Sequence, residues 1–354
     1  MLAKSYLEQY HRPDVILGGG LQRYLPKSVA GSKRNDDFDV VKAFKDLGYT
    51  YVTDSKDMMT APNNKPLLGL FTPSTMNVWL DREMLRDPQV LGGRMDQPNL
   101  INMTKKSLDI LSQNKNGFFA MIEGASIDKQ LHNMDWQRAG YDTIEFDKAI
   151  EYANDWSKKR GDDTLIIVVA DHAHGISITG TYHERDGKKG TEAVRTSADS
   201  IFPTFEDKNG DGFPDNPDPN VTLAVQYANH PTYYENFHFQ QKPTAPTLAV
   251  TKTVEEAKTV AEKTEYHQTT QNSSEANPAR IHKGDPKQLV PANIPQSITD
   301  ECHAADDVPL NAGGPGSEYF HGVMDNTEVY FGILRALGID GTKDATHLTH
   351  DIDK

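Results

Sequence analysis

In the stretch Leu165-Ile-Ile-Val-Val-Ala-Asp-His-Ala-His174, the most hydrophobic strand pattern of the chain leads directly into an acid and two histidines. A continuous apolar run predicts a strand in the middle of a parallel sheet, where both faces of the strand are covered. An amphipathic pattern at 142–160, ended by Gly161, predicts a long helix that leads into this strand. Asp171 and His172 therefore lie at a carboxyl strand end, where open α/β sheets bind their ligands.

Helical and strand patterns alternate along much of the chain on both sides of this strand. Strands are predicted at 14–17, 49–53, 66–71 and 117–122, and helices at 36–47, 103–113 and 325–337. This alternation predicts an α/β fold with a mostly parallel, doubly wound sheet that is flanked by helices. Pro, Asn, Asp, Gln and Thr dominate at about 176–300, which predicts a loop-rich insertion in a single domain over 1–354.

The charge balance excludes several classes of partner. The chain has 354 residues and a net charge of −14, so no basic face for nucleic acid is expected. An acidic protein that binds phosphate needs a locally positive site, which a bound metal ion provides. No apolar run reaches the roughly 18 residues that a membrane span needs. The first residues lack a secretory signal, so either the protein is cytoplasmic or the chain lacks its parent's natural beginning.

Acids and histidines gather after two of the predicted strands. Glu123 follows the strand at 117–122, and a helical turn would place Asp128 and His132, which are four residues apart, on one face. Carboxylate and imidazole together suit a divalent metal ion. Each pair taken alone is also typical of solvated surface side chains. Repetition at two strand ends favours a metal site, with metal-assisted hydrolysis as its chemistry.

Three longer strings then match a known family. Gly117-Phe-Phe-Ala-Met-Ile-Glu-Gly-Ala-Ser-Ile-Asp-Lys-Gln-Leu-His132, Asp142-Thr-Ile-Glu-Phe-Asp-Lys-Ala149 and Thr164-Leu-Ile-Ile-Val-Val-Ala-Asp-His-Ala-His174 resemble metal-binding segments of bacterial alkaline phosphatases. Gly18-Gly-Gly20 and Pro66-Leu-Leu-Gly-Leu-Phe71 match the family as well. The resemblance runs from about residue 5 to 340, apart from the insertion. It implies the alkaline phosphatase fold and the hydrolysis of phosphate monoesters, releasing inorganic phosphate, at a site with two zinc ions and one magnesium ion.

The resemblance also implies ligands for each metal ion. The first zinc would be bound by Asp128, His132 and His303, the second zinc by Asp171 and His172, and the magnesium by Glu123.

Two further residues match an enterobacterial variant of the family. The resemblance implies that Lys129 lies near the phosphate through water, although an exposed lysine without a role is the alternative. It implies that His174 steadies a zinc-bound carboxylate from outside the ligand set. His321 is a rival to His303 as the third ligand of the first zinc, but the string Gly314-Pro-Gly-Ser-Glu-Tyr-Phe-His321 resembles a later segment.

The family's attacking serine, phosphate-binding arginine and further metal-binding acids match nothing in this chain, since they lie upstream in the family. Asp54-Ser55-Lys-Asp57 is superficially similar to the nucleophile segment, but it follows a strand that matches a later one. We therefore expect a partial domain that is a poor phosphatase alone. A non-catalytic metal-binding protein, or a related phosphodiesterase, phosphomutase or sulfatase, remains the alternative. The resemblance also implies that the full-length parent can form a homodimer, although this chain alone need not.

The insertion contains a second candidate cation site. Asp207-Lys-Asn-Gly-Asp-Gly-Phe-Pro-Asp-Asn-Pro-Asp218 has the spacing of a calcium loop, with glycine at its sixth position. The expected ligands are Asp207, Asn209, Asp211, Asp215 and Asp218. The last position is Asp instead of the usual Glu, as in calcium loops of extracellular modules, which favours a periplasmic or secreted parent. The alternative is a turn that binds no ion.

Overall fold

The computed structural model describes residues 2–8, 12–183, 187–188, 190–196, 199–202, 204–215, 221–227 and 301–339. The chain divides into two compact units. The first unit comprises Met1–Ala149 and His174–Cys302, and the second comprises Ile150–Ala173 and His303–Lys354. The expectation of a single domain over 1–354 stays a prediction.

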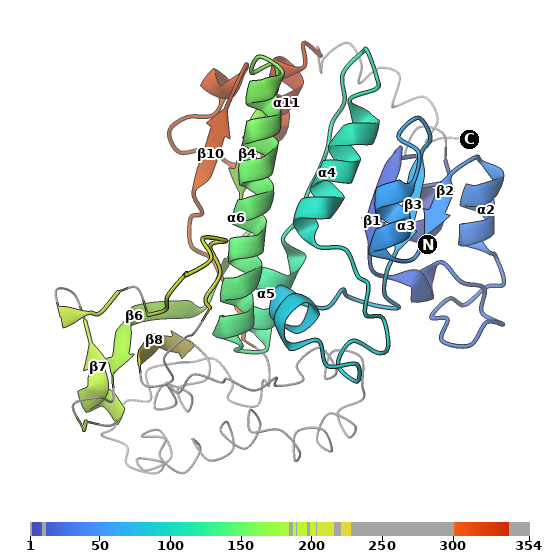
Figure 1. Ribbon diagram of the computed structural model, residues 1–354. Helices are drawn as coiled ribbons and strands as arrows, with labels where there is room; N and C mark the ends of the chain where they lie inside the picture. The colour runs from blue at the N-terminus through green and yellow to red at the C-terminus, as the bar shows by residue number, and fades with distance from the viewer. Residues whose placement is uncertain are drawn as a thin grey trace, which may run out of the picture. The chain divides into compact units, whose positions relative to one another are not determined.

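A parallel three-stranded sheet forms the core of the first unit (Figure 1). Its order is β1 (Val15–Gly18), β3 (Leu67–Leu70) and β2 (Thr50–Val52), and both outer strands run parallel to β3. All four residues of β3 are buried, as a central parallel strand requires. The predicted strands at 14–17, 49–53 and 66–71 are therefore confirmed.

Helices cover both faces of this sheet. On one face, Leu68 and Leu70 pack in a cluster with Phe44 of α2 (Val40–Asp46). On the other face, Leu67 packs in a cluster with Met58 of α3 (Ser55–Thr60) and Ile110 of α4 (Leu100–Leu111). The alternation of side chains along β3 thus supplies two apolar layers, and the predicted α/β class with helices on both sides is confirmed.

The first unit holds several further elements. They are α1 (Leu2–Ser5), η2 (Leu21–Arg23), η3 (Leu80–Leu85), α5 (Ala125–His132), most of α6 (Trp136–Lys159) and η4 (Gly190–Ala193). The described part of the insertion is more than loops, because β7 (Val194–Arg195), β6 (Ile176–His183) and β8 (Val221–Tyr227) form an antiparallel sheet in that order. Residues 228–300 of the predicted insertion lie outside the described residues.

The second unit is built on an antiparallel pair of strands. β4 (Ile166–Val169) pairs with β10 (Leu310–Gly313). β9 (His303–Ala304) also belongs to this unit, and the two-residue β5 (Ala173–His174) lies where the chain passes from the second unit to the first. η7 (Ser317–Tyr319) precedes α11 (Asn326–Ala336), which begins with a capping box at Asp325.

Two strand predictions need correction. β4 was expected to be a central parallel strand, but its partner among the described residues is the antiparallel β10, and Val169 is 43% exposed. The segment 117–122 is assigned to no strand. It still alternates like one, since Phe119 is 64% and Met121 82% exposed while their neighbours are half-buried. An apolar run predicts an extended backbone, but it does not specify the strand that pairs with it.

A buried network of charges holds the start of α6 in the first unit. Arg138 is 1% exposed, and its guanidinium donates to the carboxylates of Asp81 at 2.8 Å and Asp135 at 3.0 Å. Arg82 pairs in the same way with Glu145, which also accepts from the backbone N–H of Leu100. Each buried charge thus has an opposite partner, which is the condition for burying it at a tolerable cost.

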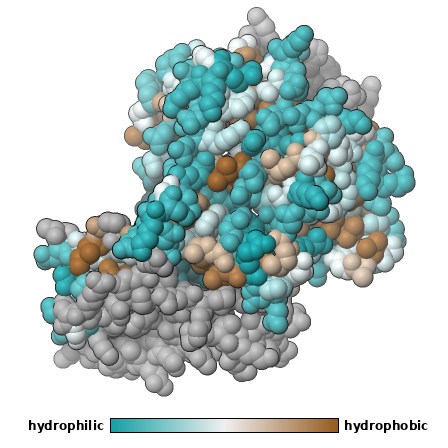
Figure 2. Space-filling model, viewed as in Figure 1, coloured by the Kyte–Doolittle hydropathy of each residue, from teal (hydrophilic) through white to brown (hydrophobic). Residues whose placement is uncertain are grey.

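The surface shows mixed polarity. On the face drawn in Figure 2, hydrophobic patches are small and are separated by hydrophilic side chains. None of the described helices combines the length and the apolar character needed to cross a lipid bilayer.

Candidate metal centre

Helix α5 places an acid and a histidine on one face. Asp128 and His132 are separated by one helical turn, and Asp128 Oδ1 lies 3.3 Å from His132 Nε2. The helix starts after Gly124, where an added Cβ would lie 3.2 Å from the Phe146 side chain of α6. Glycine at this position therefore lets α5 approach α6 closely. The predicted placement of Asp128 and His132 on one face of a helix is confirmed.

His174 approaches the same carboxylate from the end of β5. Its Nε2 lies 2.8 Å from Asp128 Oδ1, and its ring meets the His132 ring edge-on at 4.7 Å. Partial burial by itself would raise the pKa of Asp128, but the hydrogen bond with His174 and the nearby charges of His132 and Lys129 outweigh it. The pKa of Asp128 consequently lies below its ordinary value, so the carboxylate is ionised and available as a metal donor.

His172 and His303 form a pair in the second unit. Their rings stack with centroids 3.5 Å apart and planes inclined by 19°. His172 Nε2 also lies 3.6 Å from Asp171 Oδ2, and the Asp171 side chain is 85% exposed. The two imidazoles therefore lie in direct contact within the second unit.

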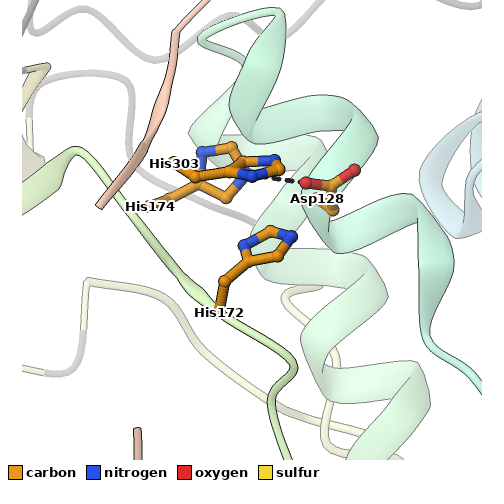
Figure 3. A group of neighbouring side chains, drawn as sticks. All are labelled: Asp128, His172, His174 and His303. Atoms are coloured by element: carbon orange, nitrogen blue, oxygen red, sulfur yellow. Dashed lines mark hydrogen bonds and ion pairs between the residues drawn. The ribbon is translucent and has the colours of Figure 1, made fainter. Parts of the chain in front are cut away.

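Four of these side chains present their donor atoms to one another. One donor atom from each of Asp128, His172, His174 and His303 lies within 4.8 Å of the others (Figure 3). A single residue separates His172 from His174, so chain connectivity keeps their donors close. Three imidazoles and a carboxylate are ligands that zinc takes readily, and the group is half-buried or more exposed, so solvent and substrate can reach it.

The remaining expected site residues differ in their exposure and in whether they contact this group. His132 contacts Asp128 and His174, whereas Glu123 is exposed in the irregular segment before α5. Lys129 is also exposed, and its Nζ lies 3.4 Å from Asp128 Oδ2. His174 was expected to contact a metal-binding carboxylate without binding the metal itself. It does contact the carboxylate of Asp128, but one of its ring nitrogens also belongs to the group of four. The ligand assignments stay predictions.

Asp54 and Ser55 have a structural role in the described fold. The Asp54 carboxylate caps α3 by accepting the backbone N–H of Asp57 at 2.8 Å, and the backbone N–H of Ser55 donates to the carbonyl of Asp96. Asp54 is therefore the N-cap residue of α3.

The candidate calcium loop is compact. Asp207 accepts the backbone N–H groups of Gly210, Asp211 and Gly212, while Asp215 accepts that of Lys208. Asn209 donates to Asp211 at 3.0 Å. The ring of Phe213, which follows the loop's second glycine, stacks on Trp79 at 3.7 Å. Asp218 lies outside the described residues.

The described fold is thus of the α/β class, and it carries a candidate metal site. Sequence comparison then identifies the family: its profile, described as alkaline phosphatase, matches residues 2–339. The chain belongs to the alkaline phosphatase family.

Individual relatives agree with this assignment. The chain is 31% identical over 341 residues to alkaline phosphatase 3 of Bacillus subtilis, covering 95% of this chain and 61% of that protein. It is 34% identical over 205 residues to alkaline phosphatase of Escherichia coli, covering 54% and 42%. The structure is similar in fold to a cold-active alkaline phosphatase of Shewanella, with a TM-score of 0.54, 21% identity, and coverage of 95% and 68%. The chain thus spans about three-fifths or less of these curated relatives.

Proposed function

We propose that this chain carries the metal-binding part of an enzyme that hydrolyses phosphate monoesters, with two zinc ions and one magnesium ion at its site. The observation that carries the proposal is the convergence of Asp128, His172, His174 and His303 in a member of this family. An acidic chain repels phosphate at long range, and bound cations would reverse that repulsion at the site.

The proposed roles follow the donor groups. Asp128, His132 and His303 would hold the first zinc, Asp171 and His172 the second, and Glu123 the magnesium. Zinc supplies positive charge that binds phosphoryl oxygens and lowers the pKa of a coordinated hydroxyl or water. His174, through its 2.8 Å contact with Asp128, would orient that carboxylate. Lys129 would add a positive charge near the phosphate.

The experiment is zinc analysis combined with hydrolysis of p-nitrophenyl phosphate by the purified full chain in zinc and magnesium. Bound zinc with turnover that a chelator abolishes would support the enzyme, and Ser55→Ala would then test for an attacking group within this chain. Bound zinc without turnover would favour the alternative, a non-catalytic metal-binding protein. Failure to bind zinc would overturn both. Asp128→Asn should lose zinc, whereas Asp155→Asn on the exposed face of α6 should not.

We also propose that the loop at Asp207–Asp215 binds calcium and that the parent protein is periplasmic or secreted and homodimeric. The convergence of Asp207, Asp211 and Asp215 on one turn supports the calcium proposal. Isothermal titration calorimetry with calcium, on the wild type and on Asp207→Asn, tests this proposal. Equal heats of binding in the two proteins would contradict calcium binding at this loop. Sedimentation of the full chain tests the dimer.

A further inference from the structure

A contact between α5 and the chain just before His303 goes beyond the ligand set. The Nδ1 atom of His132 lies 2.6 Å from the backbone carbonyl oxygen of Glu301. In return, the backbone N–H of Glu301 donates to the carbonyl of His132 at 2.9 Å. The same pair of residues is therefore joined twice, once through the imidazole and once through the main chain.

The first of these contacts has a consequence for the imidazole. A carbonyl oxygen can only accept a hydrogen bond, so Nδ1 of His132 must carry the hydrogen. In neutral imidazole the lone pair then lies on Nε2. Nε2 is also the atom that points toward Asp128 Oδ1, at 3.3 Å. A lone pair and a carboxylate oxygen that face each other form the arrangement in which a cation binds between them.

The position of Glu301 is itself fixed from several sides. The residue is 1% exposed, and the carbonyl of the next residue, Cys302, accepts the backbone N–H of Gly175 at 3.1 Å. The segment 301–302 is thus held to the end of α5 on one side and to the residue after His174 on the other. A movement of this segment would disturb His132 through two hydrogen bonds.

We infer that the main chain of Glu301 is a positioning element for His132, which holds its imidazole in the tautomer with hydrogen on Nδ1 and directs Nε2 to the metal. The inference rests on the proposed zinc-binding role of His132. It adds a residue that does not contact the metal but sets the orientation and the tautomer of one that does. Partners of this kind orient metal-binding histidines in general.

The direct test is nitrogen NMR of the zinc-free full chain at pH 8.5, with ¹⁵N in its 13 histidines. His132→Gln identifies the resonances of His132 by their loss. The expected spectrum has hydrogen on Nδ1 and a bare Nε2 at this residue. Hydrogen on Nε2 would overturn the inference. This readout requires neither zinc nor turnover, so an inactive or zinc-free protein leaves it intact, and its failure is distinct from a failure of the proposed function.

A matched pair of variants tests the effect on metal affinity. Glu301→Pro removes the N–H that donates to His132 and is expected to weaken zinc binding by roughly 10- to 100-fold. Glu301→Gln keeps both main-chain groups and the side-chain volume, so its zinc affinity should stay near that of the wild type. Equal zinc affinity in the proline variant and the wild type would contradict the inference. If circular dichroism shows that the proline variant is unfolded, the NMR spectrum of the wild type alone decides.

Discussion

The first unit contains two groups of ionisable side chains that differ in what their charges face. Around Arg138, each carboxylate faces a guanidinium, and Arg138, Asp81 and Asp135 are all nearly fully buried. Around Asp128, a carboxylate faces the imidazoles of His132 and His174, and Asp128 stays 27% exposed. Complete pairing with guanidinium groups under full burial is typical of a structural network, whereas a carboxylate that stays partly exposed among imidazoles is typical of a site for a cation.

The largest expected effect comes from breaking the pairing of the buried network. Arg138→Met keeps much of the side-chain volume but leaves Asp81 and Asp135 buried without their cation. We expect a loss of about 3–5 kcal/mol in the free energy of unfolding, because an uncompensated buried charge is costly. Urea unfolding followed by circular dichroism measures the loss.

A loss well below that range would mean that apolar packing can replace the charge pairs of this network. The network and the metal centre would then differ only in how exposed their side chains are. The double variant Arg138→Met with Asp81→Asn separates these cases. It should recover part of the stability, since one stranded charge is removed together with its partner.

The second effect lies in the metal centre. His174→Ala removes the 2.8 Å contact to Asp128, and we expect zinc affinity to fall by roughly 10- to 100-fold. Competition with a chromogenic chelator measures the affinity. His321→Ala, which changes an exposed histidine outside the group of four, is the control. A comparable loss in that control would assign His321, instead of His303, to the metal.

The two parts of the candidate metal centre could not be predicted equally well from the sequence. Asp128 and His132 are one helical turn apart, so local periodicity placed them correctly on one face. The stack of His172 on His303 joins residues that are far apart along the chain, and no local pattern specifies such a contact. The resemblance to a family supplied that grouping.

The same limit explains the strands. Pro66–Phe71 and the apolar run before Asp171 look alike in sequence, yet the former gives the buried centre of a parallel sheet and the latter pairs with an antiparallel neighbour. A hydrophobic run predicts that a segment is extended and buried. The identity of its partner depends on non-local contacts that composition does not encode.

The third effect is a dependence on pH. Burial, followed by the charge of Glu145, raises the pKa of Asp142 well above its ordinary value, although Arg82 opposes the shift. An acid whose folded pKa is raised stabilises the fold below its unfolded pKa of about 4, and this stability is lost as pH rises through the folded pKa. Asp142→Asn cannot ionise and can still accept the N–H of Trp79, so it should gain stability relative to wild type as pH rises.

Unfolding free energies of both proteins at several pH values above 4 measure this difference. Asp155→Asn, at an exposed position of the same helix, serves as the control and should follow the wild type at every pH. If the curve of Asp142→Asn also runs parallel to that of the wild type, Asp142 is ionised in the fold and belongs to the paired network after all.

The smallest expected effect belongs to an arginine at the surface. Arg160 lies 3.9 Å from Asp163 and over the ring of Trp156, and its side chain is 45% exposed. Both interactions are screened by water, so Arg160→Ala should cost about 1 kcal/mol or less in urea unfolding, against the several expected for Arg138→Met. The two variants remove the same kind of charge from a carboxylate and differ chiefly in burial. Equal losses would therefore show that burial does not separate structural charges from the rest, and the reading of the half-exposed donors around Asp128 as a cation site would lose its physical basis.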